Sequence, residues 1–115
     1  MFSESLSKIQ ALSRLAFPFN RERYPGFDRL NPEERRNFAL RHVALHVGKA
    51  QGALMGVVEA LDHGGELNIE ALTVALRKLL VDTIQTAGIA GISAETLLLA
   101  IEDWAAQEMK GWDSA

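Results

Sequence analysis

The stretch that decides the fold spans residues 31–65 and reads NPEERRNFALRHVALHVGKAQGALMGVVEALDHGG. At its start, Asn31 is a suitable N-cap, Pro32 suits the first helical position, and Glu34 stands where a capping box needs an acid. The Gly-Gly pair at its end is typical of the residues that follow a helix, because glycine adopts a left-handed conformation without strain. This stretch therefore predicts one long helix over residues 32–62.

Shorter helices are expected on either side of the long one. Leucine and isoleucine recur at helical spacing near the N-terminus, where Ser3 is a candidate N-cap, and Asn68 and Ser93 suit the N-caps of two further helices. No segment shows the apolar-polar alternation of a strand, so we predict an all-α fold with a single domain over residues 1–115. The predicted helices cover residues 3–16, 32–62, 69–87 and 94–110, and an ordered loop over residues 17–31 covers the core edge with aromatic side chains.

Composition and charge narrow the class of protein. The chain has 115 residues, of which 48% are hydrophobic and 23% are charged, as in a globular domain. A net charge of −3 argues against nucleic-acid binding, which needs a surplus of Lys and Arg. The lack of cysteine excludes disulfides and thiolate metal sites. No apolar run is long enough to cross a membrane and the N-terminus lacks a signal-peptide pattern, so we expect a cytoplasmic protein.

The long helix has two faces of different character when it is projected at about 100° per residue. One face is the expected core stripe, formed by Val43, Val47, Ala50, Leu54, Val57, Val58 and Leu61. The other carries a small residue at every fourth position, and this small-residue ridge consists of Ala44, Gly48, Gly52, Gly56 and Ala60. Each glycine costs about 1 kcal/mol relative to alanine, a cost that close packing of another helix offsets. We therefore predict a homo-oligomer, with a dimer favoured, whose interface is this ridge.

Three polar residues of the long helix, His42, His46 and Lys49, are expected beside the ridge, on the side opposite the core stripe. The two histidines are one turn apart, a spacing at which two imidazoles can share a metal ion. However, Val43 replaces the general-base glutamate of H-E-x-x-H, and no carboxylate is obviously placed as a third ligand. We therefore expect no metal here and interpret the histidines as interface residues or as partners of Tyr or Trp. Lys49 is a candidate for binding an anionic group.

Each of the two later helices is expected to bury one apolar face. The third helix would bury Ile69, Leu72, Leu76, Leu79, Leu80, Ile84 and Ala87, and the fourth would bury Leu97, Leu98, Ile101, Trp104, Ala105 and Met109. Lys78 and Asp82 are interpreted as an exposed i, i+4 ion pair. Trp112 is expected to fold back over the apolar edge.

Motifs of common enzyme classes are missing from the sequence. It contains no phosphate-binding glycine loop, dinucleotide fingerprint or serine-nucleophile motif. The acids Glu59, Asp62 and Asp82 are scattered along two helices, whereas Mg²⁺ needs several oxygen ligands around it. These observations do not favour catalysis.

The order of elements over residues 31–110 resembles the MazG-like all-α nucleotide pyrophosphohydrolases. The resemblance rests on Asn31-Pro32, on Lys49-Ala50-Gln51-Gly52-Ala53-Leu54, on Asp62-His63-Gly64-Gly65 and on Gly91-Ile92-Ser93. In that family the long helix carries E-E-x-x-E and the next helix carries E-x-x-D, and these acids bind Mg²⁺ for hydrolysis of nucleoside triphosphates. The resemblance implies a four-helix MazG-like bundle with one long central helix, and the ridge on that helix predicts a subunit partner that completes it.

The family's metal-binding positions carry other residues in this chain. When the shared glycines are aligned, the five carboxylate positions fall on Lys49, Ala50, Ala53, Ala75 and Lys78. A lysine or a neutral residue stands at each, and an ammonium group repels the metal that the reaction needs. The resemblance therefore implies the fold without the activity and without a cofactor.

Three hypotheses of function follow. The first is a catalytically silent MazG-like protein that acts through self-association, with a residual groove for a small anionic ligand near Lys49 and Lys78; His42 and His46 are further candidate ligand-binding residues. The second is an active Mg²⁺-dependent pyrophosphohydrolase that uses other carboxylates, such as Glu59, Asp62 and Asp82. The third is a helical adaptor whose groove binds a partner protein. The lysines at acidic positions favour the first over the second.

Overall fold

The computed structural model describes residues 2–15 and 24–113. These residues form four α-helices and one short 3₁₀ helix, and they contain no strand, which confirms the all-α prediction. The α-helices are α1 (Phe2–Leu15), α2 (Pro32–Asp62), α3 (Ile69–Ile89) and α4 (Ala94–Asp113), and the 3₁₀ helix η1 is Phe27–Arg29.

Three helix starts are set by side-chain caps, as the sequence predicts. The side chain of Asn31 accepts a hydrogen bond from the backbone N–H of Glu34 (2.9 Å), whose carboxylate accepts one from the Asn31 N–H (3.1 Å). Asn68 caps α3 through the Ala71 N–H (3.0 Å), and Ser93 caps α4 through the Thr96 N–H (3.1 Å). Each cap satisfies a backbone donor that would otherwise lack an intrahelical partner.

Three glycines were expected to end helices, and the helix continues past two of them. Gly64 ends α2 with φ +86°, as expected, but α3 continues past Gly88 to Ile89, and α4 continues past Gly111. The left-handed residue after α3 is Gly91, with φ +80°. A glycine ends a helix only where it adopts that conformation, and Gly88 does not.

Two further boundaries at the N-terminal side need correction or lie outside the described chain. Helix α1 begins at Phe2, so Ser3 lies within the helix and is not its N-cap. Of the predicted loop over residues 17–31, residues 17–23 lie outside the described part. The remainder contains η1, in which Phe27 packs against Phe38 of α2 with ring centroids 5.8 Å apart.

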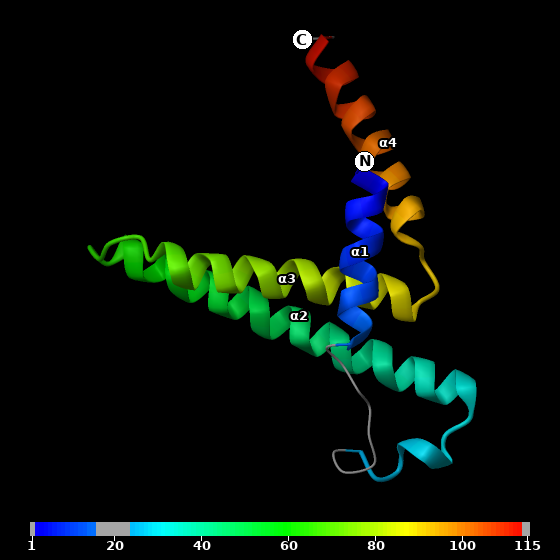
Figure 1. The fold of residues 1–115 in the computed structure, drawn as a ribbon. Helices are drawn as coiled ribbons and strands as arrows, with labels where there is room; N and C mark the ends of the chain where they lie inside the picture. Colours follow the sequence, from blue (N-terminus) through cyan, green and yellow to red (C-terminus); the bar gives the residue numbers. More distant parts are fainter. Residues whose placement is uncertain (1, 16–23, 114–115) are drawn as a thin grey trace.

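The four helices are arranged as a hairpin and a crossing pair (Figure 1). Helices α2 and α3 run antiparallel and form the largest contact in the chain. Helix α1 crosses the C-terminal part of α3, and α4 packs mainly on α1 and projects away from the hairpin. No single helix within the described residues meets the length and hydropathy of a membrane span; α3 and α4 do so only together, as a pair bent by 114°.

Helix α1 is attached to α3 and its following turn by polar contacts. The side-chain amide of Gln85 donates to the carbonyl of Ser13 (2.9 Å), and that of Gln10 donates to the carbonyl of Ile92 (3.0 Å). Gln10, Ser13 and Gln85 are all buried. A Cβ on Gly88 would lie 3.4 Å from the Gln10 amide nitrogen, so the glycine leaves room for this polar bridge.

The hydrophobic core of the single chain is small. Among the residues that the structure describes, the buried apolar ones are Ala39, Val43, Ala50, Ala75, Ile84, Ala87 and Ala94. Several residues that were predicted to be core are exposed instead: Val58 and Leu61 on α2, Ile69, Leu76 and Leu80 on α3, and Ile101, Trp104 and Met109 on α4. The prediction of their burial within one chain was wrong because each helix is covered on only part of its apolar surface.

The shape of the molecule is correspondingly open. Its radius of gyration is 17.6 Å, whereas a compact domain of this length has about 13 Å. Its solvent-accessible surface is 8792 Å², whereas a folded monomer of 12.6 kDa exposes about 6,200 Å². The chain therefore exposes about 2,600 Å² more than a monomer of its mass, and large apolar side chains such as Trp104, Met109 and Leu80 are among the exposed ones.

Candidate functional site

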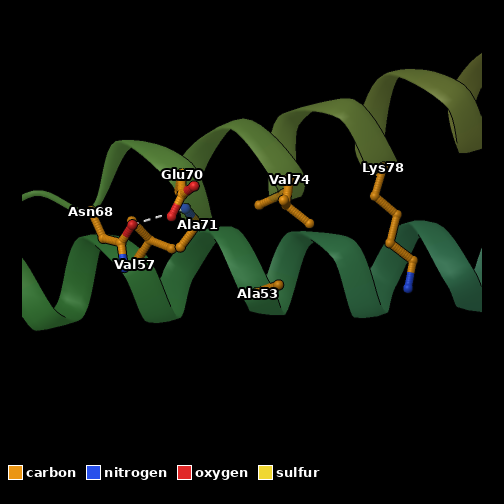
Figure 2. A pocket seen from close by; sticks show the side chains of 8 residues that line it. Ala53, Val57, Asn68, Glu70, Ala71, Val74 and Lys78 are labelled. Atoms are coloured by element: carbon orange, nitrogen blue, oxygen red, sulfur yellow. Dashed lines mark hydrogen bonds between the residues drawn. The ribbon is translucent and has the colours of Figure 1, made fainter.

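One candidate site is a groove between α2 and the first half of α3, with a volume of about 630 Å³ (Figure 2). This α2–α3 groove is lined by Ala53, Val57, Asn68, Glu70, Ala71, Val74, Ala75 and Lys78. The alanines keep its floor low, because their side chains are too short to fill the space between the two helices.

Polar groups stand only toward the ends of the α2–α3 groove. At one end the Lys78 side chain extends from α3 toward α2, and Asn68 and Glu70 lie at the other end (Figure 2). The side-chain oxygen of Asn68 already caps α3. Lys78 makes no hydrogen bond or ion pair with another described residue, so its ammonium group remains available to an anion.

The groove contains part of the site that the family resemblance implies. Ala53, Ala75 and Lys78 line it, whereas Ala50 is buried and Lys49 lies outside the lining set. Three of the five aligned positions therefore meet in one groove, but they present two methyl groups and an ammonium group. No group of three or more His, Asp or Glu residues in the described chain is arranged to hold a metal ion.

The alternative carboxylates Glu59, Asp62 and Asp82 are not brought together. In the antiparallel hairpin Val47 lines a groove with Thr83, so Asp82 lies toward the first half of α2, near the level of Lys49. Asp62 is thirteen residues further along α2, which is about 20 Å at 1.5 Å per residue. These acids cannot coordinate one metal ion together.

A second cluster is formed by His42, His46 and Tyr24. The Nε2 atoms of the two histidines are 3.0 Å apart, and the Tyr24 hydroxyl is 2.9 Å from Nε2 of His42. The His42 ring stacks on Phe38 (centroids 6.1 Å, interplanar angle 20°) and meets Tyr24 edge-on (5.2 Å, 83°). All four side chains are half-buried.

This geometry corrects the predicted position of the histidines. They do not lie on an open face opposite the core stripe, but pack under Tyr24 at the edge of the core. Burial, followed by the charges of His46 and Lys49, lowers the pKa of His42 from its usual value of 6.5. The neutral imidazole is therefore favoured at neutral pH.

The small-residue ridge is exposed along its whole length on α2. Ala44, Gly48, Gly52, Gly56 and Ala60 are all exposed, and a Cβ added at any of the three glycines would meet nothing within 4 Å. The ridge therefore packs against no described segment of its own chain. At one end Ala44 joins a smaller groove of about 320 Å³, lined by Ala44, Val47, Thr83 and Thr86.

One feature was missed by the sequence reasoning. Asp82 is not in an exposed ion pair with Lys78 but is buried, and its Oδ2 atom has no hydrogen-bond partner among the described residues. The interpretation of the histidines as partners of Tyr or Trp is confirmed for His42, whose partner is Tyr24, although no spacing rule identifies that residue. The predicted position of the Trp112 side chain lies outside the described residues.

Comparison of this chain with protein-family models, with curated proteins and with solved structures finds no match. A function for it must therefore be argued from the open hairpin, the α2–α3 groove and the histidine cluster.

Proposed function

We propose that this chain is a catalytically silent, MazG-like helical protein that acts through self-association, as a homodimer. The observation that carries the proposal is the excess of about 2,600 Å² of exposed surface over a monomer of this mass. Interfaces of obligate homodimers bury about 2,000–5,000 Å² in total and are rich in apolar residues. Two copies of this chain have surface of the required size and character.

The face of the hairpin that a second copy would cover can be specified. Leu76 and Leu80 are 48% and 50% exposed and share a face of α3 with Thr83, which lines the smaller groove beside Ala44. Residues spaced by three, four or seven positions lie on one side of a helix. The small-residue ridge leads away from this groove along α2, so a second hairpin placed here would contact both the leucines and the ridge.

The residues that line the α2–α3 groove support a site without catalytic activity. A divalent magnesium ion takes several oxygen ligands, and the α2–α3 groove supplies Glu70 as its only carboxylate. Lys78 adds a positive charge at one of the positions where the related enzymes carry an acid. We include in the proposal a residual role for this groove, which is binding of a small anionic ligand by Lys78, with Lys49 nearby on α2.

The test of self-association is the molar mass of the full chain in solution, measured by sedimentation equilibrium over a wide concentration range. We expect a dimer for the native chain and a monomer for Leu80→Glu, because a buried unpaired charge is costly at an apolar interface. Leu99→Glu is the matched control: Leu99 is 55% exposed but lies on α4, so this variant should stay dimeric.

Two results would contradict the proposal. A native chain that stays monomeric at every concentration excludes self-association. A monomer that gains stability only when a partner protein is added would instead support the helical adaptor hypothesis.

A further inference from the structure

We propose that His42 and His46 form a binding site for one divalent transition-metal ion of the zinc, nickel and copper class. The two Nε2 atoms converge to 3.0 Å at the surface of α2, one helical turn apart. This site is separate from the α2–α3 groove and is independent of self-association, since it is complete in one chain.

The distance between the nitrogens suits a shared ion. Metal–nitrogen bonds of imidazole are about 2.0–2.1 Å long, so two such ligands at a right angle lie about 2.9 Å apart and at a tetrahedral angle about 3.4 Å apart. The observed 3.0 Å lies between these values. The two nitrogens are therefore already at a separation that one ion can bridge.

The hydrogen-bond partners of His42 also favour an ion between the two histidines. Nε2 of a neutral imidazole carries either one hydrogen or one lone pair. Nε2 of His42 nevertheless has two polar neighbours within hydrogen-bond distance, the Tyr24 hydroxyl and Nε2 of His46. One nitrogen cannot make a full, well-directed hydrogen bond to both. A metal ion would accept the lone pairs of both histidines in place of the contact between the rings, and the Tyr24 hydroxyl would then give up its hydrogen bond to Nε2 of His42.

The surrounding residues hold the ligands in place. His42 is fixed between Phe38 and Tyr24, and both histidines are half-buried on a long helix, so less side-chain entropy is lost on binding. The positive charge of Lys49 opposes a cation, so Lys49 limits the affinity of the site.

The ligand type sets the class of metal. Imidazole binds zinc, copper and nickel ions well and magnesium poorly. Two protein ligands leave the remaining coordination positions to water, so the ion is exchangeable.

The experiment is calorimetric titration of the full chain with Zn²⁺, Ni²⁺ and Cu²⁺ in a buffer that does not chelate metals, with helicity checked by circular dichroism. We expect one ion per chain, and affinity reduced about tenfold or more in His42→Gln and in His46→Gln, because each variant loses one of two ligands. His63→Gln is the matched control, since His63 is the third histidine and lies exposed at the end of α2. Lys49→Gln should bind more tightly than the native chain.

The spectroscopic signature is a Cu²⁺ electron paramagnetic resonance spectrum with coupling to two imidazole nitrogens, reduced to one in either single variant. Three results would overturn the proposal: no saturable binding, binding unchanged in both folded histidine variants, or binding lost in His63→Gln.

Discussion

Substitution of Gly52 tests whether the small-residue ridge is an interface, because a larger side chain there should stabilise an isolated chain but weaken a dimer built on the ridge. In the single chain a Cβ at this position meets nothing within 4 Å, so Gly52→Ala relieves the conformational cost of glycine at no steric expense. The expected gain in free energy of unfolding is about 0.8–1 kcal/mol. Gly52→Leu should gain nearly as much in an isolated chain.

In a dimer built on the ridge the leucine has the opposite effect. Overpacking a close helix contact costs about 1–3 kcal/mol, which weakens association about 5- to 150-fold. Gly52→Ala adds only one methyl group and should weaken association less than Gly52→Leu. The dissociation constant from sedimentation equilibrium and the unfolding free energy from urea titration of dilute protein separate the two effects.

Gly111→Leu supplies the control for helix propensity. Gly111 lies within α4, and a Cβ there also meets nothing within 4 Å, so leucine should stabilise the chain without changing the dissociation constant. If Gly52→Leu behaves like Gly111→Leu in both measurements, the ridge is ordinary exposed surface and the reasoning about close packing is refuted.

Three further outcomes are expected. The native chain should release no pyrophosphate from nucleoside triphosphates with Mg²⁺ or Mn²⁺; metal-dependent turnover that disappears in Asp62→Asn or Asp82→Asn would show that the site was misplaced. The pKa of His42 is lowered on folding, so as the pH falls the imidazole of His42 is protonated in the unfolded chain before it is protonated in the folded chain. The contribution of His42 to the free energy of unfolding is therefore present above about pH 6.5 and lost below it. Urea titrations at pH 8 and pH 5 should show a smaller difference in His42→Gln than in the native chain, and an equal difference would disprove the assignment. Asp82→Ala should raise the free energy of unfolding by about 1–3 kcal/mol, because it removes a buried oxygen without a partner, whereas the exposed Asp103→Ala should change it by less than about 0.5 kcal/mol.

The starts of α2, α3 and α4 could be predicted from the sequence because their causes are local. Asn31, Asn68 and Ser93 each accept a hydrogen bond from a backbone N–H three residues later, so a short window of sequence contains both partners. The end of α2 also has a local cause, because the left-handed conformation that ends it is adopted by one residue, Gly64. The four helices and their order follow from such signals.

Burial could not be predicted from the same patterns. The apolar spacing of Leu76 and Leu80 indicates that this face prefers to leave water, but not whether the cover comes from the same chain. A helical projection places Asp82 on the exposed side of α3, yet its side chain is buried in the folded chain. The contact of Tyr24 with His42 depends on how a Pro- and Gly-containing segment returns to α2, which no periodicity encodes.

The polar bridge between α1 and α3 has a consequence for the order of folding. The hairpin of α2 and α3 joins residues that are neighbours along the chain, whereas Gln85 pairs with Ser13 across 72 residues and Gln10 pairs with Ile92 across 82. Contacts of long sequence separation form late, because the intervening chain must first lose entropy. During synthesis at about 5–20 residues per second, Gln10 waits about 4–16 s for Ile92 to appear. Helix α1 therefore reaches its place only after α3 and the turn that follows it have been synthesised, and until then the end of α3 that it covers stays open to other chains.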